Sequence, residues 1–98
     1  MSFKKVNVAV QLLPFTEKSR VYPIVDKAIE VIKSSGIKHV VTPFETVLEG
    51  DYDAIMDVVK KIQEAAFDAG AENILVNLKI QNSKLADALI EDKTGKYQ

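Results

Sequence analysis

The chain has 98 residues, of which 47% are apolar and 28% charged, a composition typical of globular proteins. Its 13 basic and 14 acidic residues leave a net charge of −1 without a basic stripe, so nothing points to nucleic acid. The absence of cysteine excludes disulfides, thiolate metal sites and a cysteine nucleophile. We expect a single domain over residues 1–98, located in the cytoplasm, because no apolar run suits a signal sequence or a membrane span.

The first predicted strand covers residues 6–13. Valine and leucine at the even positions alternate with a mixed odd face that carries Asn7 and Gln11. This period of two, with β-branched residues, is typical of a strand that has one buried face. Pro14 ends the strand because it cannot donate a hydrogen bond to the sheet.

A helix is predicted next. Apolar residues recur at three- and four-residue spacing from Val21 to Ile32. Ser19 is the candidate N-cap, and Pro23 fits the first turn, where its missing N–H costs nothing. Gly36 can take the left-handed conformation that ends a helix.

Two short strands, residues 37–42 and 46–50, follow the helix. Residues 43–45 join them, and this connection is short enough for an antiparallel hairpin. Asp51 then caps a second amphipathic helix, which ends at Gly70.

Residues 74–81 form the last predicted strand, again with an aliphatic even face. Ser83 can cap a short C-terminal helix, and the polar tail at residues 91–98 is expected to fray. The apolar residues of this short helix are Leu85, Ala88 and Leu89.

The predicted order of elements is β-α-β-β-α-β plus a short C-terminal helix. This α+β plan is the ferredoxin-like fold, a four-stranded antiparallel sheet with strand order 4-1-3-2. Right-handed crossovers place both long helices on one face of the sheet. The other face is expected to be left uncovered by this chain.

Polar side chains are expected on this open face. If Thr46 and Leu48 point toward the helices, Glu49 points the other way. We expect the first and third strands to be parallel neighbours, which brings Glu49 to the same end of the face as Gln11 and Asn77. A carboxylate and two amides can form hydrogen bonds with the donor and acceptor groups of a small heterocycle. Neighbouring aliphatic residues would pack against its ring.

Simpler interpretations remain open at this stage. A face that mixes apolar residues with amides often serves as an oligomer interface. Glu49 could pair with Lys79 across the strands, which contributes roughly 0.2–1 kcal/mol. Tyr22 and Phe15 could form the walls of a pocket or pack as ordinary residues. No metal site is expected around His39, the only histidine, and no cofactor motif or nucleophile–base–acid set is present.

Three segments resemble one family. They are Gln11–Pro14, the threonine-proline turn with glutamate-glycine in Thr42–Gly50, and Val76–Ile80. Together they are similar to the thiamine-binding protein family, also known as UPF0045 or YkoF-like, and the resemblance runs from about residue 6 to 84. Many members of the family have two aspartates and an arginine after the fourth strand. This chain lacks these three residues at that place.

The resemblance implies a non-enzymatic ferredoxin-like protein that binds thiamine or its hydroxymethylpyrimidine moiety. It also implies a homo-oligomer, a dimer of dimers, with the ligand held at a subunit interface. The ligand-facing positions that it suggests are Gln11, Thr46, Glu49 and Asn77, with Thr42 and Lys79 as further candidates.

Two alternatives are retained. One is a structural or regulatory oligomeric module that binds no small ligand. The other is an acylphosphatase-like hydrolase, in which Arg20 would hold the phosphate. The second alternative is weakened because the loop at residues 14–19 lacks the glycines that form a phosphate nest.

Overall fold

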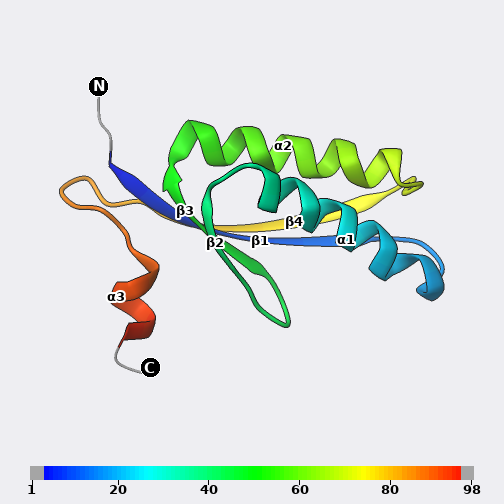
Figure 1. Cartoon of the computed structure of the whole chain (residues 1–98), viewed down its shortest axis with the longest axis horizontal. Coiled ribbons are helices and arrows are strands. Elements are labelled where there is room, and N and C mark those ends of the chain that lie inside the picture. Colours follow the sequence, from blue (N-terminus) through cyan, green and yellow to red (C-terminus); the bar gives the residue numbers. More distant parts are fainter. Residues whose placement is uncertain (1–3, 96–98) are drawn as a thin grey trace.

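The computed structural model describes residues 4–95. Seven elements follow one another along the chain (Figure 1). They are β1 Lys5–Pro14, α1 Lys18–Ser34, β2 Lys38–Val41, β3 Thr46–Asp51, α2 Tyr52–Asp68, β4 Ile74–Gln81 and α3 Ile90–Thr94. No helix in this range is long and apolar enough to cross a membrane.

The four strands form one antiparallel sheet in the order β2-β3-β1-β4, which confirms the predicted ferredoxin-like order. The prediction that the first and third strands are parallel was wrong, because Val10 pairs with Thr46 and Asn7 with Glu49 in an antiparallel register. The hairpin reverses the chain between β2 and β3. Since the crossover through α1 makes β2 parallel to β1, β3 must run opposite to β1.

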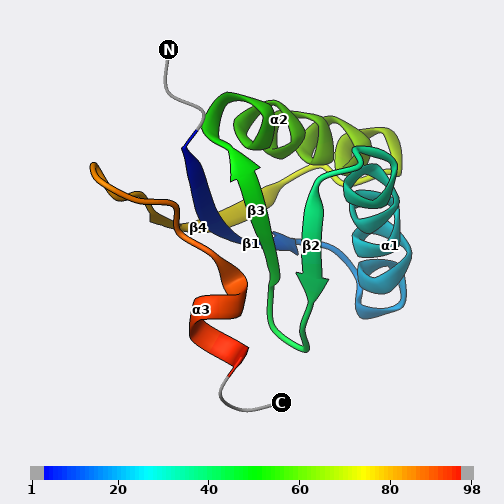
Figure 2. The same ribbon diagram turned by 60° about the vertical axis from the view of Figure 1, so that its left-hand side comes forward.

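The core lies between the sheet and the two long helices. Figures 1 and 2 show α1 and α2 together on one side of the sheet. The even-numbered valines of β1 are buried there, and Leu48 of β3 packs among them with no exposed surface. The predicted orientation of β3, with Thr46 and Leu48 toward the helices, is therefore confirmed.

The long helices end largely as expected. The Asp51 side chain accepts a hydrogen bond from the Ala54 N–H at 3.0 Å and caps α2. Gly36 and Gly70 follow the two helices with φ of 76° and 110°. Residues that carry a side chain rarely adopt such backbone angles. The start of α1 differs from the prediction.

Helix α1 begins at Lys18, with Glu17 and not Ser19 at the N-cap position. Pro23 consequently lies inside the helix, beyond the first turn where it was expected. The Arg20 N–H bonds the Glu17 carbonyl at 2.8 Å, which closes the extra first turn. This turn carries no apolar residue on the core face, so the hydrophobic spacing gave no sign of it.

The C-terminal segment differs most from the prediction. Residues 83–89 are not helical, and α3 begins only at Ile90, so most of it lies within the tail that was expected to fray. Figures 1 and 2 show α3 on the side of the sheet opposite to α1 and α2. The face expected to be open is therefore partly covered by the chain itself.

Candidate ligand-binding site

The open face is built from rows of side chains that cross the sheet. One row contains Asn77 and Gln11, which are paired on β4 and β1. The next row contains Lys79, Ala9 and Val47, and the row after that contains Gln81, Asn7, Glu49 and Lys38. The predicted site residues are thus distributed over separate rows.

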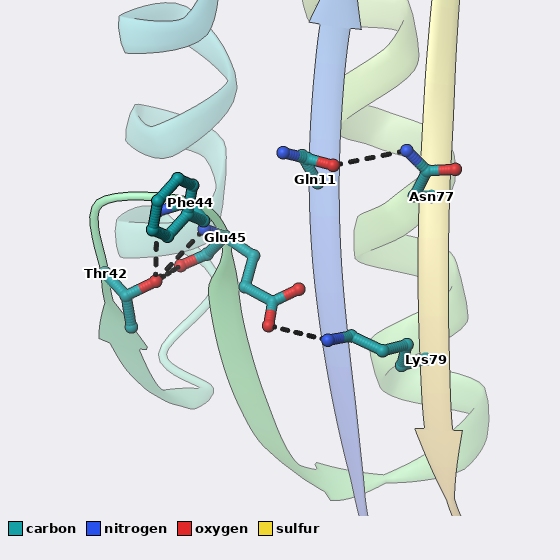
Figure 3. A network of polar contacts seen from close by, with 6 residues as sticks. All are labelled: Gln11, Thr42, Phe44, Glu45, Asn77 and Lys79. Atoms are coloured by element: carbon teal, nitrogen blue, oxygen red, sulfur yellow. Dashed lines mark hydrogen bonds and ion pairs between the residues drawn. The ribbon is translucent and has the colours of Figure 1, made fainter.

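Two predicted residues meet as expected. The Asn77 amide Nδ2 donates a hydrogen bond to Gln11 Oε1 at 3.2 Å, and both side chains remain partly accessible on the open face (Figure 3). The pairing of β1 with β4 places these residues directly opposite each other. The pair leaves further amide donors and acceptors available to a ligand.

The carboxylate beside this pair belongs to Glu45. Its Oε1 lies 3.1 Å from Lys79 Nζ, and the lysine side chain reaches across β1 to make this ion pair (Figure 3). The Glu45 side chain is 26% exposed, whereas that of Lys79 is 76% exposed. Glu45 is therefore a half-buried carboxylate whose cationic partner faces solvent.

A hollow of about 310 Å³ lies next to this ion pair. Ala9 and Val47, which are neighbours on β1 and β3, supply part of its apolar lining. Glu45 and Lys79 border it on one side and Lys93 on another, and the remaining lining residues are Asn7, Ile80 and Gln81.

The prediction that Glu49 joins Gln11 and Asn77 was wrong. Glu49 is paired with Asn7 near the start of β1, whereas Gln11 lies further along that strand. The cause is the antiparallel register, which puts the end of β3 beside the beginning of β1. The predicted pair between Glu49 and Lys79 is also absent, since Lys79 contacts Glu45.

Glu49 is buried on the open face, with its side chain 3% exposed. One carboxylate oxygen accepts a hydrogen bond of 2.6 Å from the Ile90 N–H, and the other lies 3.5 Å from Lys38 Nζ. A buried carboxylate needs such partners to offset its lost hydration. We call residues 87–94, which cover Glu49, the C-terminal strap.

The two predicted threonines lie away from the open-face hollow. Thr42 organises the β2–β3 turn: its hydroxyl donates to the Glu45 carbonyl at 2.6 Å and accepts from the Phe44 and Glu45 N–H groups (Figure 3). Thr46 is buried on the helix-facing side of β3. These two residues are therefore not brought together with Asn77 and Lys79.

Both threonines line a second cavity, a slot of about 280 Å³ between α1 and the hairpin. The slot opens where β1 and β3 separate, since their pairing ends at Val10 and Thr46. Tyr22 and Phe44, which are 73% and 80% exposed, also line it, and Gln11 and Glu45 border it. Tyr22 therefore lines a cavity, as one of the two interpretations had it, whereas Phe15 is not among the residues that line the slot.

Other features do not contribute to these cavities. A larger hollow of about 510 Å³ lies between α1 and α2, but none of the predicted site residues lines it. Arg20 donates to the Gly70 carbonyl at 3.1 Å and so links the start of α1 to the end of α2. His39 contacts the Ile37 carbonyl at 2.8 Å, and no group of three His, Asp or Glu side chains within residues 4–95 could hold a metal ion.

Sequence reasoning missed Glu45, Asn7 and Lys93. Alternation along β3 contained the signal for Glu45, because it shares the odd-numbered face with Val47 and Glu49. It was missed because residues 43–45 were assigned to the turn. Lys93 had no such signal, since its place depends on how the strap folds back over the sheet.

Comparison with known proteins identifies relatives of this chain. The family described as "Thiamine-binding protein" matches residues 8–98. A UPF0045 protein of Clostridium perfringens is 42% identical over 92 residues, which cover 94% of this chain and 96% of the relative. A UPF0045 protein of Methanocaldococcus jannaschii is 32% identical over 90 residues, covering 92% and 89%.

Solved structures agree with this comparison. A domain of unknown function from Bacillus cereus superposes with a TM-score of 0.92 at 38% identity, covering 98% of this chain and 92% of that one. A Thermotoga maritima protein proposed to act in thiamine biosynthesis or salvage gives 0.89 at 34% identity, covering 96% and 99%. The chain belongs to the thiamine-binding protein (UPF0045) family.

Proposed function

We propose that this protein binds thiamine or its hydroxymethylpyrimidine moiety and does not transform it. The observation that carries the proposal is a partly apolar hollow bordered by the Glu45–Lys79 ion pair, with the Gln11–Asn77 pair in the next row of side chains on the same face. Membership of the thiamine-binding protein family supports the ligand class.

The chemistry of an aminopyrimidine suits this arrangement. The Glu45 carboxylate would accept a hydrogen bond from the exocyclic amine and could bond a protonated ring nitrogen. Gln11 and Asn77 would fix the orientation of the ring through their amides. Ala9 and Val47 would contact the ring face, and a volume of about 310 Å³ is enough for a small ring compound.

Binding would exchange one partner of Glu45 for another. The ligand amine takes the place of Lys79, whose ammonium group then moves into water. This exchange costs little, because the side chain of Lys79 is already 76% exposed and such ion pairs contribute about 0–1 kcal/mol. The exposed partner therefore leaves the Glu45 carboxylate accessible to the ligand.

We further propose that a second copy of the chain closes over the ligand, within a homo-oligomer built as a dimer of dimers. Leu13 and Leu75 face each other across β1 and β4 and are 38% and 46% exposed. Val40 of β2 is 43% exposed. Exposed apolar residues on a sheet face commonly mark a protein contact.

Calorimetric titration with hydroxymethylpyrimidine tests the site. We expect Glu45→Gln to raise the dissociation constant by about ten-fold or more, because a neutral amide replaces a charge-assisted acceptor. The matched control is Glu72→Gln, which neutralises an exposed carboxylate outside the lining of the hollow and should bind like the unmodified protein. Thiamine should be recovered intact after incubation with the protein.

The slot provides the competing location for the ligand. Tyr22→Ala removes an aromatic side chain from the slot without touching the open-face hollow. Lost binding by Tyr22→Ala would contradict the open-face site whatever Glu45→Gln does, because Glu45 lines both cavities and Tyr22 only the slot. Failure of the unmodified protein to bind either thiamine or hydroxymethylpyrimidine would contradict the proposed function itself.

A further inference from the structure

Glu49 belongs to the segment Thr42–Gly50, one of the three that resemble the family, yet it does not line the open-face hollow. We propose that Glu49 is a positioning residue that fastens the C-terminal strap, residues 87–94, as one wall of the ligand hollow. This inference rests on the proposed function, because it assigns Glu49 a role at the same site. It follows from the contacts that hold the strap.

The strap is attached to the edge of the hollow by several polar contacts. The Ile90 N–H donates to Glu49 Oε1 at 2.6 Å. This bond joins the strap to a buried carboxylate. The backbone of Lys5 adds two bonds: its N–H donates to Asp87 Oδ1 at 2.7 Å, and its carbonyl accepts from the Ala88 N–H at 3.0 Å.

The strap in turn positions Lys93. The Asn7 amide can hydrogen-bond to both Ala88 and Lys93 in one of its two orientations. In that orientation its nitrogen donates to the Ala88 carbonyl at 2.8 Å. Its oxygen accepts from Lys93 Nζ at 2.6 Å. Asn7 and Lys93 both line the hollow, so the fastening at Glu49 and the wall of the hollow belong to one connected set of contacts.

The strap has the properties of an element with two states. Helix α3 has five residues, which is too short to be stable in water without packing. Ala88 and Ile90 supply the buried apolar surface of the strap. The segment between β4 and α3 is irregular and mostly exposed. Docking of the strap therefore depends on a few contacts, and among its charge-assisted bonds the one to Glu49 is the one that is buried.

Release of the strap would change the site without touching its polar cluster. The hollow would lose Lys93, while Glu45, Gln11 and Asn77 would stay in place on the sheet. If the ligand binds only to the docked form, its apparent affinity falls in proportion to the docked fraction. Glu49 would then control affinity although it never contacts the ligand.

Hydrogen exchange measured by mass spectrometry on residues 87–94, combined with titration of hydroxymethylpyrimidine, tests this role. In Glu49→Ala we expect exchange of the strap amides to accelerate about ten-fold or more, with a parallel loss of affinity. Glu49→Gln keeps an acceptor oxygen for Ile90 and should show an intermediate effect. Glu91→Gln neutralises an exposed acid on the same helix and should leave the strap protected.

A contrast with Glu45 separates positioning from ligand contact. Glu45→Gln should lose affinity while its strap exchanges as slowly as in the unmodified protein. An unchanged strap in Glu49→Ala, or a released strap with full affinity, would overturn the inference and leave the proposed function standing. If Glu49→Ala does not fold, as judged by circular dichroism, Glu49→Gln supplies the same comparison.

Discussion

Two carboxylates on one face of β3 and its preceding turn have different surroundings. Glu49 is buried and held by a backbone N–H and Lys38, whereas Glu45 is half-buried and paired with the exposed Lys79. A ligand can displace an exposed surface lysine far more easily than a buried backbone contact. This difference assigns ligand contact to Glu45 and a structural role to Glu49.

The side chain of Thr42 sets the position of Glu45, since its hydroxyl makes three hydrogen bonds within the turn. We predict that Thr42→Val lowers the free energy of unfolding by about 1 kcal/mol, because these bonds are lost and water only partly replaces them. Urea denaturation measures the change. Thr42→Ser keeps the hydroxyl and is the control; equal stability of Thr42→Val and the unmodified protein would contradict the prediction.

At the scale of elements, each long helix is held by packing, and α2 also by its N-cap. Helix α2 buries a full stripe against the sheet and begins directly after β3. Asp51 ends β3 and caps α2 at once, so it fixes the angle at which the chain leaves the sheet. The strap lacks both a long helix and a side-chain cap, which makes it the element most dependent on its contacts.

Removing the N-cap of α2 should have a measurable cost. We predict that Asp51→Ala lowers the free energy of unfolding by about 1 kcal/mol, because the Ala54 N–H loses its acceptor. Thermal and urea denaturation provide the measurement. Asn is about as good an N-cap as Asp, so Asp51→Asn should recover most of the stability, and a loss as large as that of Asp51→Ala would argue against capping as the cause.

At the scale of the whole molecule, the two faces of the sheet are unequal. The helix face is covered by α1 and α2, whereas the strap covers only the end of the other face near Asn7 and Glu49. The uncovered part contains the polar cluster and the exposed leucine pair of β1 and β4. This division leaves room for a second copy next to the proposed ligand site.

The assembly of copies can be tested at this surface. We predict that the unmodified protein is oligomeric and that Leu75→Lys shifts it toward fewer copies, because a charge would be buried against a sister chain. Native mass spectrometry reports the copy number and any retained small molecule. Leu85→Lys changes a leucine that is 91% exposed and should not alter assembly; a monomeric unmodified protein would refute the prediction.

Local patterns were enough to predict most of the fold. Alternating valines in β1 and the helical spacing in α2 depend on neighbours within a few residues, so they identified each long element and its buried face. The same holds for Asp51, Gly36 and Gly70, whose roles follow from local backbone geometry. That Gln11 and Asn77 share the open face was also predictable, because both lie on odd positions of adjacent strands.

The candidate site depended on information that the sequence alone did not supply. The direction of β3 decides that Glu45, and not Glu49, lies beside Gln11, and this direction is a property of the whole sheet. The strap likewise places Lys93 at the hollow through contacts with residues more than eighty positions earlier in the chain. Sequence patterns therefore determined the elements and their faces, whereas only the tertiary structure decided which polar side chains meet, because such contacts join residues distant in the chain.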